Sequence, residues 1–223
     1  MSPDYTSPDG RIKLYRADCM DYMATLEDNA FELAVVDPPY GIDAAKKPIS
    51  MGRFKRDIHK PKSWDNSAPN NDYFKSILRV NNNQIIWGGN YFIDYLESTR
   101  CFLVWDKNNG GNNMSDCELA WTSFCGGVRK FTRSHIDDHN AGIKRIHPTQ
   151  KPVKLYDWIY TNYAKEGDRI LDTHLGSGSS AIAAHYAGLE FVGIELDADY
   201  FNAAVRRFEK ETAQGDMFGK AAK

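Results

Sequence analysis

Leu33-Ala-Val-Val-Asp-Pro-Pro-Tyr40 is an apolar run that stops at an acidic residue and two prolines. Four apolar residues predict a short buried strand, and proline ends the strand because it lacks the N–H that a sheet ladder requires. The chain must therefore leave the sheet at the carboxyl end of this strand, where ligands bind in open α/β sheets. The turn brings together a carboxylate, carbonyls without strand partners and an aromatic ring. Such a set can hold a flat ring that bears an amine.

The length and composition indicate one globular domain. The chain has 223 residues, of which 42% are hydrophobic and 13% aromatic, enough to bury a sizeable core. No apolar run reaches the ~18 residues of a membrane span, and the first residues have no signal-peptide pattern. We therefore expect a soluble cytoplasmic protein with no membrane partner. Its four cysteines lack a CxxC pair, so we expect reduced thiols and no metal site.

A second nucleotide-binding pattern lies near the end of the chain. Residues 169–172 read as a strand, 173–178 as a tight turn, 179–187 as a helix and 191–195 as the next strand. This βαβ unit ends in Glu195, where a carboxylate can bind both hydroxyls of a ribose. Its glycines also satisfy the dinucleotide fingerprint, so an NAD enzyme is an alternative. We disfavour it because only a helix (199–211) and a tail follow, too little for a second mononucleotide half.

The remaining pattern is also of α/β type. A strand over 11–16 ends near Asp18, which either caps the following helix (20–26) or binds a ligand. Strands over 101–106 and 118–123 predict an antiparallel hairpin at one sheet edge. Further elements are expected as helices over 72–80, 91–97 and 153–160 and a strand over 84–87.

Four motifs in one order resemble the β-class of DNA amino-methyltransferases. They are Asp18, Asp37-Pro-Pro-Tyr40, His147-Pro-Thr-Gln-Lys-Pro152, and the glycine turn 172–178 with Glu195. The resemblance implies a Rossmann-like, seven-stranded, mostly parallel sheet with an antiparallel edge hairpin and circularly permuted motifs. It implies S-adenosylmethionine as cofactor. This chain departs from the family at Asp172-Thr173-His174, where Asp-Pro-Phe is usual, which leaves open what packs beside the methionine part.

The resemblance also assigns the site residues. The catalytic set would be Asp37, Pro38, Pro39 and Tyr40. The cofactor set would be Asp18, Cys19, Asp37, His147, Thr149, Gln150, Lys151, Asp172, Gly176, Ser177, Gly178, Ser179, Glu195 and Leu196. Read from the residues alone, Thr149 and Lys151 place a hydroxyl and a cation at a helix start, which suits an anion.

The predicted reaction is methylation of adenine N6 in DNA. An exocyclic amine in a duplex must be flipped out, and Tyr40 offers a ring on which to stack the base. Asp37 and the carbonyl of Pro38 would accept the amine hydrogens. An Asp at the first motif position favours adenine within the family; cytosine N4 methylation and a catalytically silent DNA-binding protein are the alternatives. No Pro-Cys pair occurs, so a cytosine-C5 mechanism is excluded.

The middle of the chain is basic and predicts contact with DNA. Residues 41–151 hold 17 Lys and Arg against 11 Asp and Glu, whereas the whole chain has a net charge of −2. A basic middle on an acidic frame suits one DNA-binding face, although a solvated loop is the alternative. A zinc site from Cys117, Cys125, His135 and His139 is disfavoured by its spacing. The predicted DNA contacts are Lys46, Lys47, Arg53, Lys55, Arg56, Lys60, Lys62, Arg129, Lys130 and Arg133.

We expect residues 1–223 to form one methyltransferase domain, monomeric or homodimeric, as in a restriction-modification system. Within it, 41–72 would be a basic loop insertion, 107–146 a short target-recognition segment and 212–223 a flexible tail. The tail segment Gln214-Gly-Asp-Met-Phe218 resembles the peptide that docks bacterial proteins on the replication sliding clamp. A frayed terminus is the alternative that we prefer.

Overall fold

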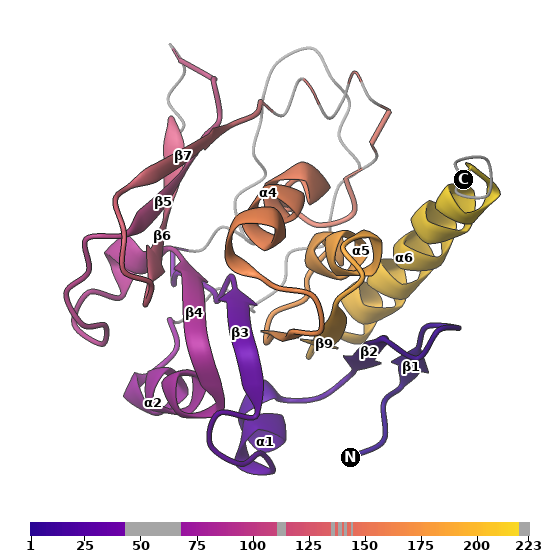
Figure 1. Cartoon of the computed structure of the whole chain (residues 1–223), viewed down its shortest axis with the longest axis horizontal. Coiled ribbons are helices and arrows are strands. Elements are labelled where there is room, and N and C mark those ends of the chain that lie inside the picture. Colours follow the sequence, from indigo (N-terminus) through magenta and orange to yellow (C-terminus); the bar gives the residue numbers. More distant parts are fainter. Residues whose placement is uncertain are drawn as a thin grey trace.

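The computed structural model describes residues 1–42, 68–110, 115–134, 137, 140, 142–143 and 145–218. In these ranges nine strands form one sheet (Figure 1). In spatial order they are β1 (Tyr5–Thr6), β2 (Ile12–Tyr15), β9 (Glu190–Ile194), β8 (Arg169–Asp172), β3 (Phe31–Val36), β4 (Asn81–Trp87), β6 (Cys117–Thr122), β5 (Phe102–Asp106) and β7 (Arg129–Thr132).

The centre of the sheet is parallel. The five strands β2, β9, β8, β3 and β4 pair in parallel, whereas β6 is antiparallel to both β4 and β5. The predicted mostly parallel α/β fold with an antiparallel hairpin is therefore confirmed. Seven strands were predicted, and the two additional ones are the short β1 and β7. Because β7 pairs with β5, the hairpin does not form the sheet edge.

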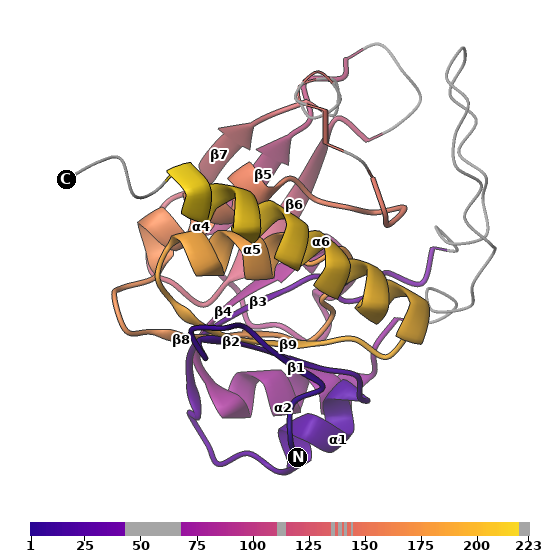
Figure 2. The ribbon, with the colours of Figure 1, turned by 90° about the vertical axis from the view of Figure 1, so that its right-hand side faces the viewer.

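Helices cover both faces of the sheet, as Figure 2 shows. Along β3, Leu33 and Val35 point to one face and Ala34 and Val36 to the other, as the two-residue period of a strand requires. All four side chains are buried, which explains the continuous apolar run. One face carries α4 (Val153–Tyr163), α5 (Ser179–Tyr186) and α6 (Ala198–Phe218), and the other carries α1 (Cys19–Ala24) and α2 (Asn71–Val80).

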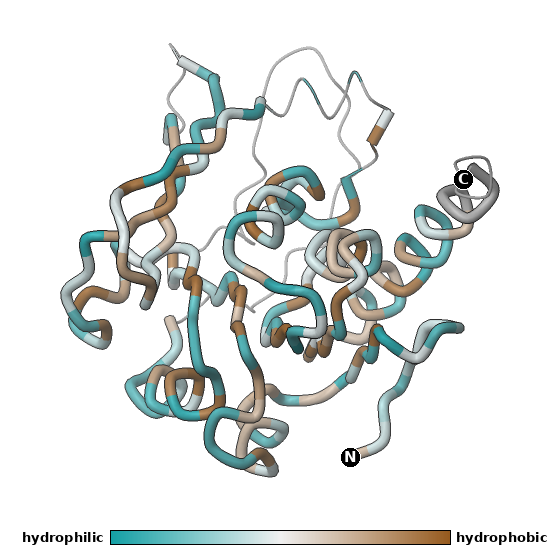
Figure 3. The backbone as a smooth tube through the Cα atoms, viewed as in Figure 1, coloured by the Kyte–Doolittle hydropathy of each residue, from teal (hydrophilic) through white to brown (hydrophobic). Residues whose placement is uncertain are grey.

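The start and packing of α2 follow from its sequence. Asn70 caps the helix, because its side-chain oxygen accepts from the backbone amides of Asp72 and Tyr73. The helix then buries Tyr73, Phe74 and Ile77 on the sheet and leaves polar residues outside, seen as alternating brown and teal in Figure 3. This fixes the point at which the chain returns from residues 43–67.

One predicted local structure is wrong. The helix predicted over residues 91–97 is instead a 3₁₀ turn, η1 (Gly89–Tyr91), followed by further turns. Its bonds span three residues, as from the Tyr91 amide to the Gly88 carbonyl, and the buried Phe92 holds the segment against Phe74. The segment predicted as a flexible tail from residue 212 begins within α6, which buries Thr212 and ends at Phe218. Its flexibility remains a prediction.

Several predictions fall outside the described residues. Most of the predicted 41–72 insertion does so, and His135 and His139 of the zinc alternative do too, as do the side chains of Gln214–Phe218. These remain predictions. In the described ranges, no helix has the length and apolar character needed to span a bilayer. The predicted DNA contacts that lie outside the described residues are Lys46, Lys47, Arg53, Lys55, Arg56, Lys60 and Lys62.

The strand order brings distant motifs to one edge. Leu33 of β3 pairs with Ile170 of β8, and Tyr15 of β2 pairs with Ile194 of β9. Because all these strands are parallel, their carboxyl ends lie on the same side of the sheet. Asp18, Asp37, Thr173 and Glu195 follow those four ends. A site at this edge therefore combines the first 40 and the last 60 residues.

Candidate active site

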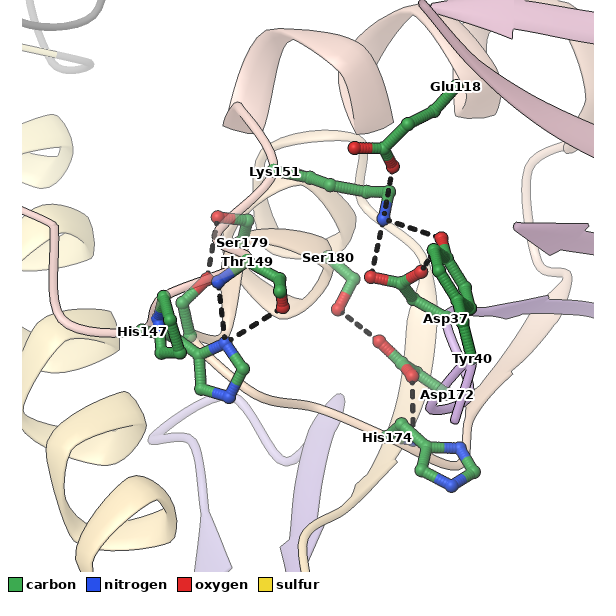
Figure 4. A network of polar contacts seen from close by, with 12 residues as sticks. Asp37, Tyr40, Glu118, His147, Thr149, Lys151, Asp172, His174, Ser179 and Ser180 are labelled. Atoms are coloured by element: carbon green, nitrogen blue, oxygen red, sulfur yellow. Dashed lines mark hydrogen bonds and ion pairs between the residues drawn. The ribbon is translucent and has the colours of Figure 1, made fainter. Parts of the chain in front are cut away.

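Asp37 lies at the centre of a group of polar contacts (Figure 4). The hydroxyl of Tyr40 donates to Asp37 Oδ1 at 2.6 Å, and Lys151 Nζ donates to Asp37 Oδ2 at 2.5 Å. Lys151 Nζ also lies 3.4 Å from the Tyr40 hydroxyl. The Asp-Pro-Pro-Tyr turn therefore folds back on itself, and residue 151 from the end of another loop completes it.

The Tyr40 ring is held from several sides. Tyr91 stacks on it with ring centroids 4.9 Å apart, and Phe92 meets it edge-on at 6.1 Å. Gly88 contacts it so closely that a Cβ there would lie 2.2 Å from Tyr40 Cε1. Gly88 also has a φ of +72°, which glycine adopts freely. The absence of a side chain at Gly88 thus makes room for the Tyr40 ring, whose hydroxyl bonds to Asp37.

Burial and the neighbouring charges together set the charge states of Asp37 and Lys151. Burial raises the pKa of Asp37, and the charge of Glu118 adds to this, although Lys151 acts in the opposite direction. Burial lowers the pKa of Lys151, but Asp37 and Glu118 together raise it above its usual value. Lys151 is therefore a cation shared by two carboxylates, and Asp37 is a carboxylate with increased affinity for a proton.

The glycine turn lies at the amino end of α5. The Gly176 amide donates to Glu195 Oε2 at 2.9 Å, and Gly178 has a φ of +73° just before the helix. Arg207 of α6 donates to the Ser177 carbonyl at 3.0 Å and to Ser179 Oγ at 2.9 Å. Glu195 after β9 and Arg207 of α6 thus hold the turn in place. Its backbone lies next to Glu195, the residue predicted to bind the ribose.

Asp18 takes the capping position that one interpretation predicted. Its Oδ1 accepts from the Met20 amide at 2.7 Å and caps α1. The residue also lines the cavity described below, so capping is compatible with binding a ligand. Its predicted contact with a cofactor amine remains a prediction.

The His147 loop closes over the glycine turn. The ring of His147 lies 4.3 Å from that of Tyr200 and borders Gly176. Thr149 Oγ1 lies 3.1 Å from His147 Nδ1, and Gln150 Oε1 accepts from the Ile146 amide at 3.0 Å. These contacts within the loop fix its conformation before Pro152, the N-cap residue that precedes α4.

A cavity of about 350 Å³ runs along this edge of the sheet. Its walls include Asp37 and Pro39 from the proline turn and Gly176 from the glycine turn, so it joins the two motifs. The volume is within the usual range for a small-molecule site. The other predicted residues in its walls are Asp18, Cys19, His147, Thr149, Gln150, Lys151, Ser177, Glu195 and Leu196.

Three predicted cofactor residues are not in the walls. Asp172 is buried below the turn, where Ser180 Oγ donates to it at 2.5 Å and the His174 amide donates at 3.0 Å. Gly178 and Ser179 begin α5 and support the turn. The structure thus places these three residues behind the site.

The sequence prediction missed other residues of the site. Tyr73 and Thr173 line the cavity, with 2.7 Å between their hydroxyl oxygens, and His174 lines it where the family usually has Phe. Burial lowers the pKa of His174 to about 4, so this ring is neutral near pH 7. Glu118, at 3.0 Å from Lys151 Nζ, was also missed. The motif departure at 173–174 was the only signal for any of these residues.

The described basic residues of the predicted DNA set lie in and after β7. Arg129 and Lys130 are exposed, and Arg133 is partly exposed. Lys130 Nζ pairs with Asp106 at 3.1 Å, which offsets part of its charge. These residues face away from the buried core, as contact with a polyanion requires, and the contact itself remains a prediction.

Comparison with known proteins identifies the family. The family model for N6/N4 DNA methylases matches residues 55–206. The chain belongs to this family. The DNA methylase is 22% identical over 253 residues to the type II methyltransferase M2.MboI of Moraxella bovis, with 95% of this chain and 93% of that protein covered. A 65-residue stretch is 43% identical to M2.DpnII of Streptococcus pneumoniae, covering 29% of this chain and 24% of the relative.

Solved structures confirm the fold of the DNA methylase. A complex of M1.HpyAVI with S-adenosylmethionine superposes with a TM-score of 0.58 at 20% identity, covering 88% of this chain and 99% of that one. The cytosine-N4-specific PvuII DNA methyltransferase gives 0.60 at 15% identity, with 93% and 89% covered. At these identities the likeness concerns the fold alone. The predicted family and fold class are thus confirmed, and the choice between adenine and cytosine is not made by either comparison.

Proposed function

We propose that this DNA methylase transfers a methyl group from S-adenosylmethionine to the N6 amine of an adenine flipped out of DNA. One observation carries the proposal: a single cavity extends from the glycine turn to the carboxylate of Asp37. A methyl donor held at the turn and an amine held at Asp37 would then share one enclosed space. Bringing two reactants together in this way supplies much of the rate enhancement of such a transfer.

The residues present fit the cofactor. The backbone at Gly176 permits close approach, Glu195 offers a carboxylate for ribose hydroxyls, and Asp18 offers one for an amine. The neutral ring of His174 and the hydroxyl of Tyr73 line the same space. When bound, S-adenosylmethionine supplies a methyl group on a positively charged sulfur.

The Asp37 corner would hold the amine. A carboxylate offers about four lone-pair positions, and Tyr40 and Lys151 use one on each oxygen, so Asp37 keeps acceptor capacity for an N–H. The Pro38 carbonyl is a second acceptor, because proline prevents a following strand from using it. The bound cofactor would supply the methyl group to the nitrogen of this amine, with its carbon–sulfur bond as the bond that breaks, and the nitrogen would then release a proton. Asp37, whose pKa burial raises, is the base that accepts this proton.

The preference for adenine rests on Asp37 itself, since an Asp at the first motif position favours adenine within the resemblance stated above. The alternative is cytosine N4, which presents the same kind of exocyclic amine. A catalytically silent DNA-binding protein is a further alternative, and the complete Asp37, Tyr40 and Lys151 arrangement disfavours it.

Labelled cofactor tests the proposal. The protein is incubated with tritiated S-adenosylmethionine and unmethylated DNA, and the DNA is digested to nucleosides. Label in N6-methyladenosine is expected, and label in N4-methylcytosine would instead identify the other base. Asp37→Asn should abolish transfer while cofactor binding persists, whereas Asp94→Asn, at an exposed carboxylate outside the cavity, should retain full activity. DNA binding without any label would refute catalysis.

A further inference from the structure

Four charges, two of them buried and two half-buried, alternate in sign behind the Asp-Pro-Pro-Tyr turn. Lys107 Nζ lies 2.7 Å from Glu118 Oε1, Glu118 Oε2 lies 3.0 Å from Lys151 Nζ, and Lys151 Nζ lies 2.5 Å from Asp37 Oδ2. The Lys151 side chain is only 3% exposed and that of Lys107 10%. Figure 4 shows Lys151 between the two carboxylates. The order of charges is therefore positive, negative, positive, negative, with no net charge.

The β5–β6 hairpin fixes the outer half of this array. Lys107 directly follows β5, and its amide donates to the Asp116 carbonyl at 2.9 Å, while Glu118 lies in β6 opposite Trp105. The Lys107 ammonium lies 5.3 Å from the centre of the Trp105 ring. Lys151 is similarly placed, 5.3 Å from the centre of the Trp87 ring. Aromatic rings and paired carboxylates thus limit where each ammonium can lie.

Charge balance explains why both hairpin residues are present. Although burial alone favours a neutral carboxyl, Lys151 and Lys107 lower the pKa of Glu118 to about 2. Glu118 therefore stays an anion near pH 7. A buried ion that loses its partner is strongly unfavourable, so Glu118 requires Lys107 in addition to the Lys151 that it shares with Asp37.

We propose that Glu118 and Lys107 are positioning residues that act through Lys151 on Asp37 and set how readily Asp37 remains an ionised acceptor. Glu118 competes with Asp37 for the Lys151 ammonium, and Lys107 moderates that competition. Lys151 thus serves the acceptor carboxylate. This inference rests on the proposed function, which makes Asp37 the acceptor of the amine.

Substitutions of Glu118 and of Lys107 should shift the pH profile of methyl transfer in opposite directions. Removing the anion with Glu118→Gln leaves Lys151 paired with Asp37 alone. The acid limb of the pH profile, where the single-turnover rate falls as pH decreases, should therefore shift to a pH about one unit lower. Removing the cation with Lys107→Met strengthens the hold of Glu118 on Lys151, so the acid limb should move up. The double variant removes a neutral pair and should return the limb toward the wild-type position. A purely structural role of the hairpin would lower stability without opposite shifts.

Other groups near Asp37 do not produce this pattern. Tyr40, Tyr73 and Tyr156 have pKa values raised well above the ordinary tyrosine value, so they stay neutral. Burial raises the pKa of Asp172 to about 7, and this residue is unchanged in every variant. Glu166→Gln, at an exposed loop carboxylate, is the matched control and should leave the profile unchanged.

The measurements are the pH profile at saturating cofactor and DNA, and the dissociation constant of S-adenosylmethionine. The latter should stay within about twofold in Glu118→Gln, since Glu118 does not line the cavity. An unchanged acid limb, shifts in the same direction, or a large loss of cofactor affinity would overturn the inference. If Glu118→Gln does not fold, Lys107→Met alone carries the test.

A second readout separates this inference from the proposed function. The Asp37 carboxyl titration can be followed by carbon-13 NMR in the wild type and in each variant without any turnover. A wild type that fails to methylate DNA would refute the proposed function only, and the NMR shifts would still decide the inference. Methylation with an unmoved Asp37 titration would refute the inference only.

Discussion

Gly88→Ala tests whether the Tyr40 ring must be held where the structure places it. The new Cβ would lie 2.2 Å from Tyr40 Cε1, whereas carbon atoms in contact are ~3.5–4.0 Å apart. The ring must therefore move by more than ~1 Å, and its bond to Asp37 and its stack on Tyr91 resist the movement. A displacement of this size at a reacting centre lowers a rate by about 100-fold.

The matched control is Gly10→Ala. Gly10 has a similar φ of +77°, but a Cβ there would meet nothing within 4 Å. It therefore carries the backbone strain alone, about 1–2 kcal/mol, whereas Gly88→Ala adds the cost of overpacking, about 1–3 kcal/mol. Both variants are compared by denaturant unfolding and by single-turnover methyl transfer under conditions in which each is folded. Equal transfer rates in the two folded variants would refute the argument that the position of Tyr40 controls the reaction.

Two further variants test the support behind the cavity. Tyr73→Phe removes the hydroxyl that lies 2.7 Å from Thr173 Oγ1. This variant should lower the unfolding free energy by about 1 kcal/mol and weaken cofactor binding. Tyr95→Phe, at an exposed tyrosine, is the control and should do neither. Burial raises the pKa of Asp172 to about 7, so the folded protein binds a proton that the unfolded chain releases near pH 4, and the contribution of Asp172 to the unfolding free energy should fall as pH rises from about 4 to about 7. The lowered pKa of His174 gives a contribution of opposite slope. Asp172→Asn should therefore make the slope of the unfolding free energy against pH more positive than in the wild type in denaturation series across this range, and an unchanged slope would contradict the assignment.

The parallel centre of the sheet could be predicted because its strands are buried on both faces. Leu33–Val36 and Ile85–Trp87 are continuous apolar runs with turn residues after them, and such runs have few other interpretations. The segment after β4 could not be predicted in the same way. Its apolar residues suggest a helix, but Gly88 has a left-handed conformation and Phe92 packs inward, both of which depend on tertiary contacts.

The site was predicted at its motif residues and missed at their supports. Asp37, Gly176 and Glu195 follow strands that carry clear patterns. Glu118 lies within a strand whose alternation gives no reason for a buried carboxylate, and only its pairing with Lys107 and Lys151 explains it. These partners are 11 and 33 positions from Glu118, and contacts at such separations leave no local signal in a single sequence.

The placement of β8 beside β3 has a consequence for synthesis. While the first two thirds of the chain leave the ribosome, β3 can pair with β4 but has no neighbour on its other side, because β8 lies near residue 170. β2 likewise lacks its parallel partner until β9 has been synthesised. Unpaired strand edges invite pairing with other chains, and closing such long separations is slow. The nascent protein therefore passes through an aggregation-prone interval that ends only when its last third emerges.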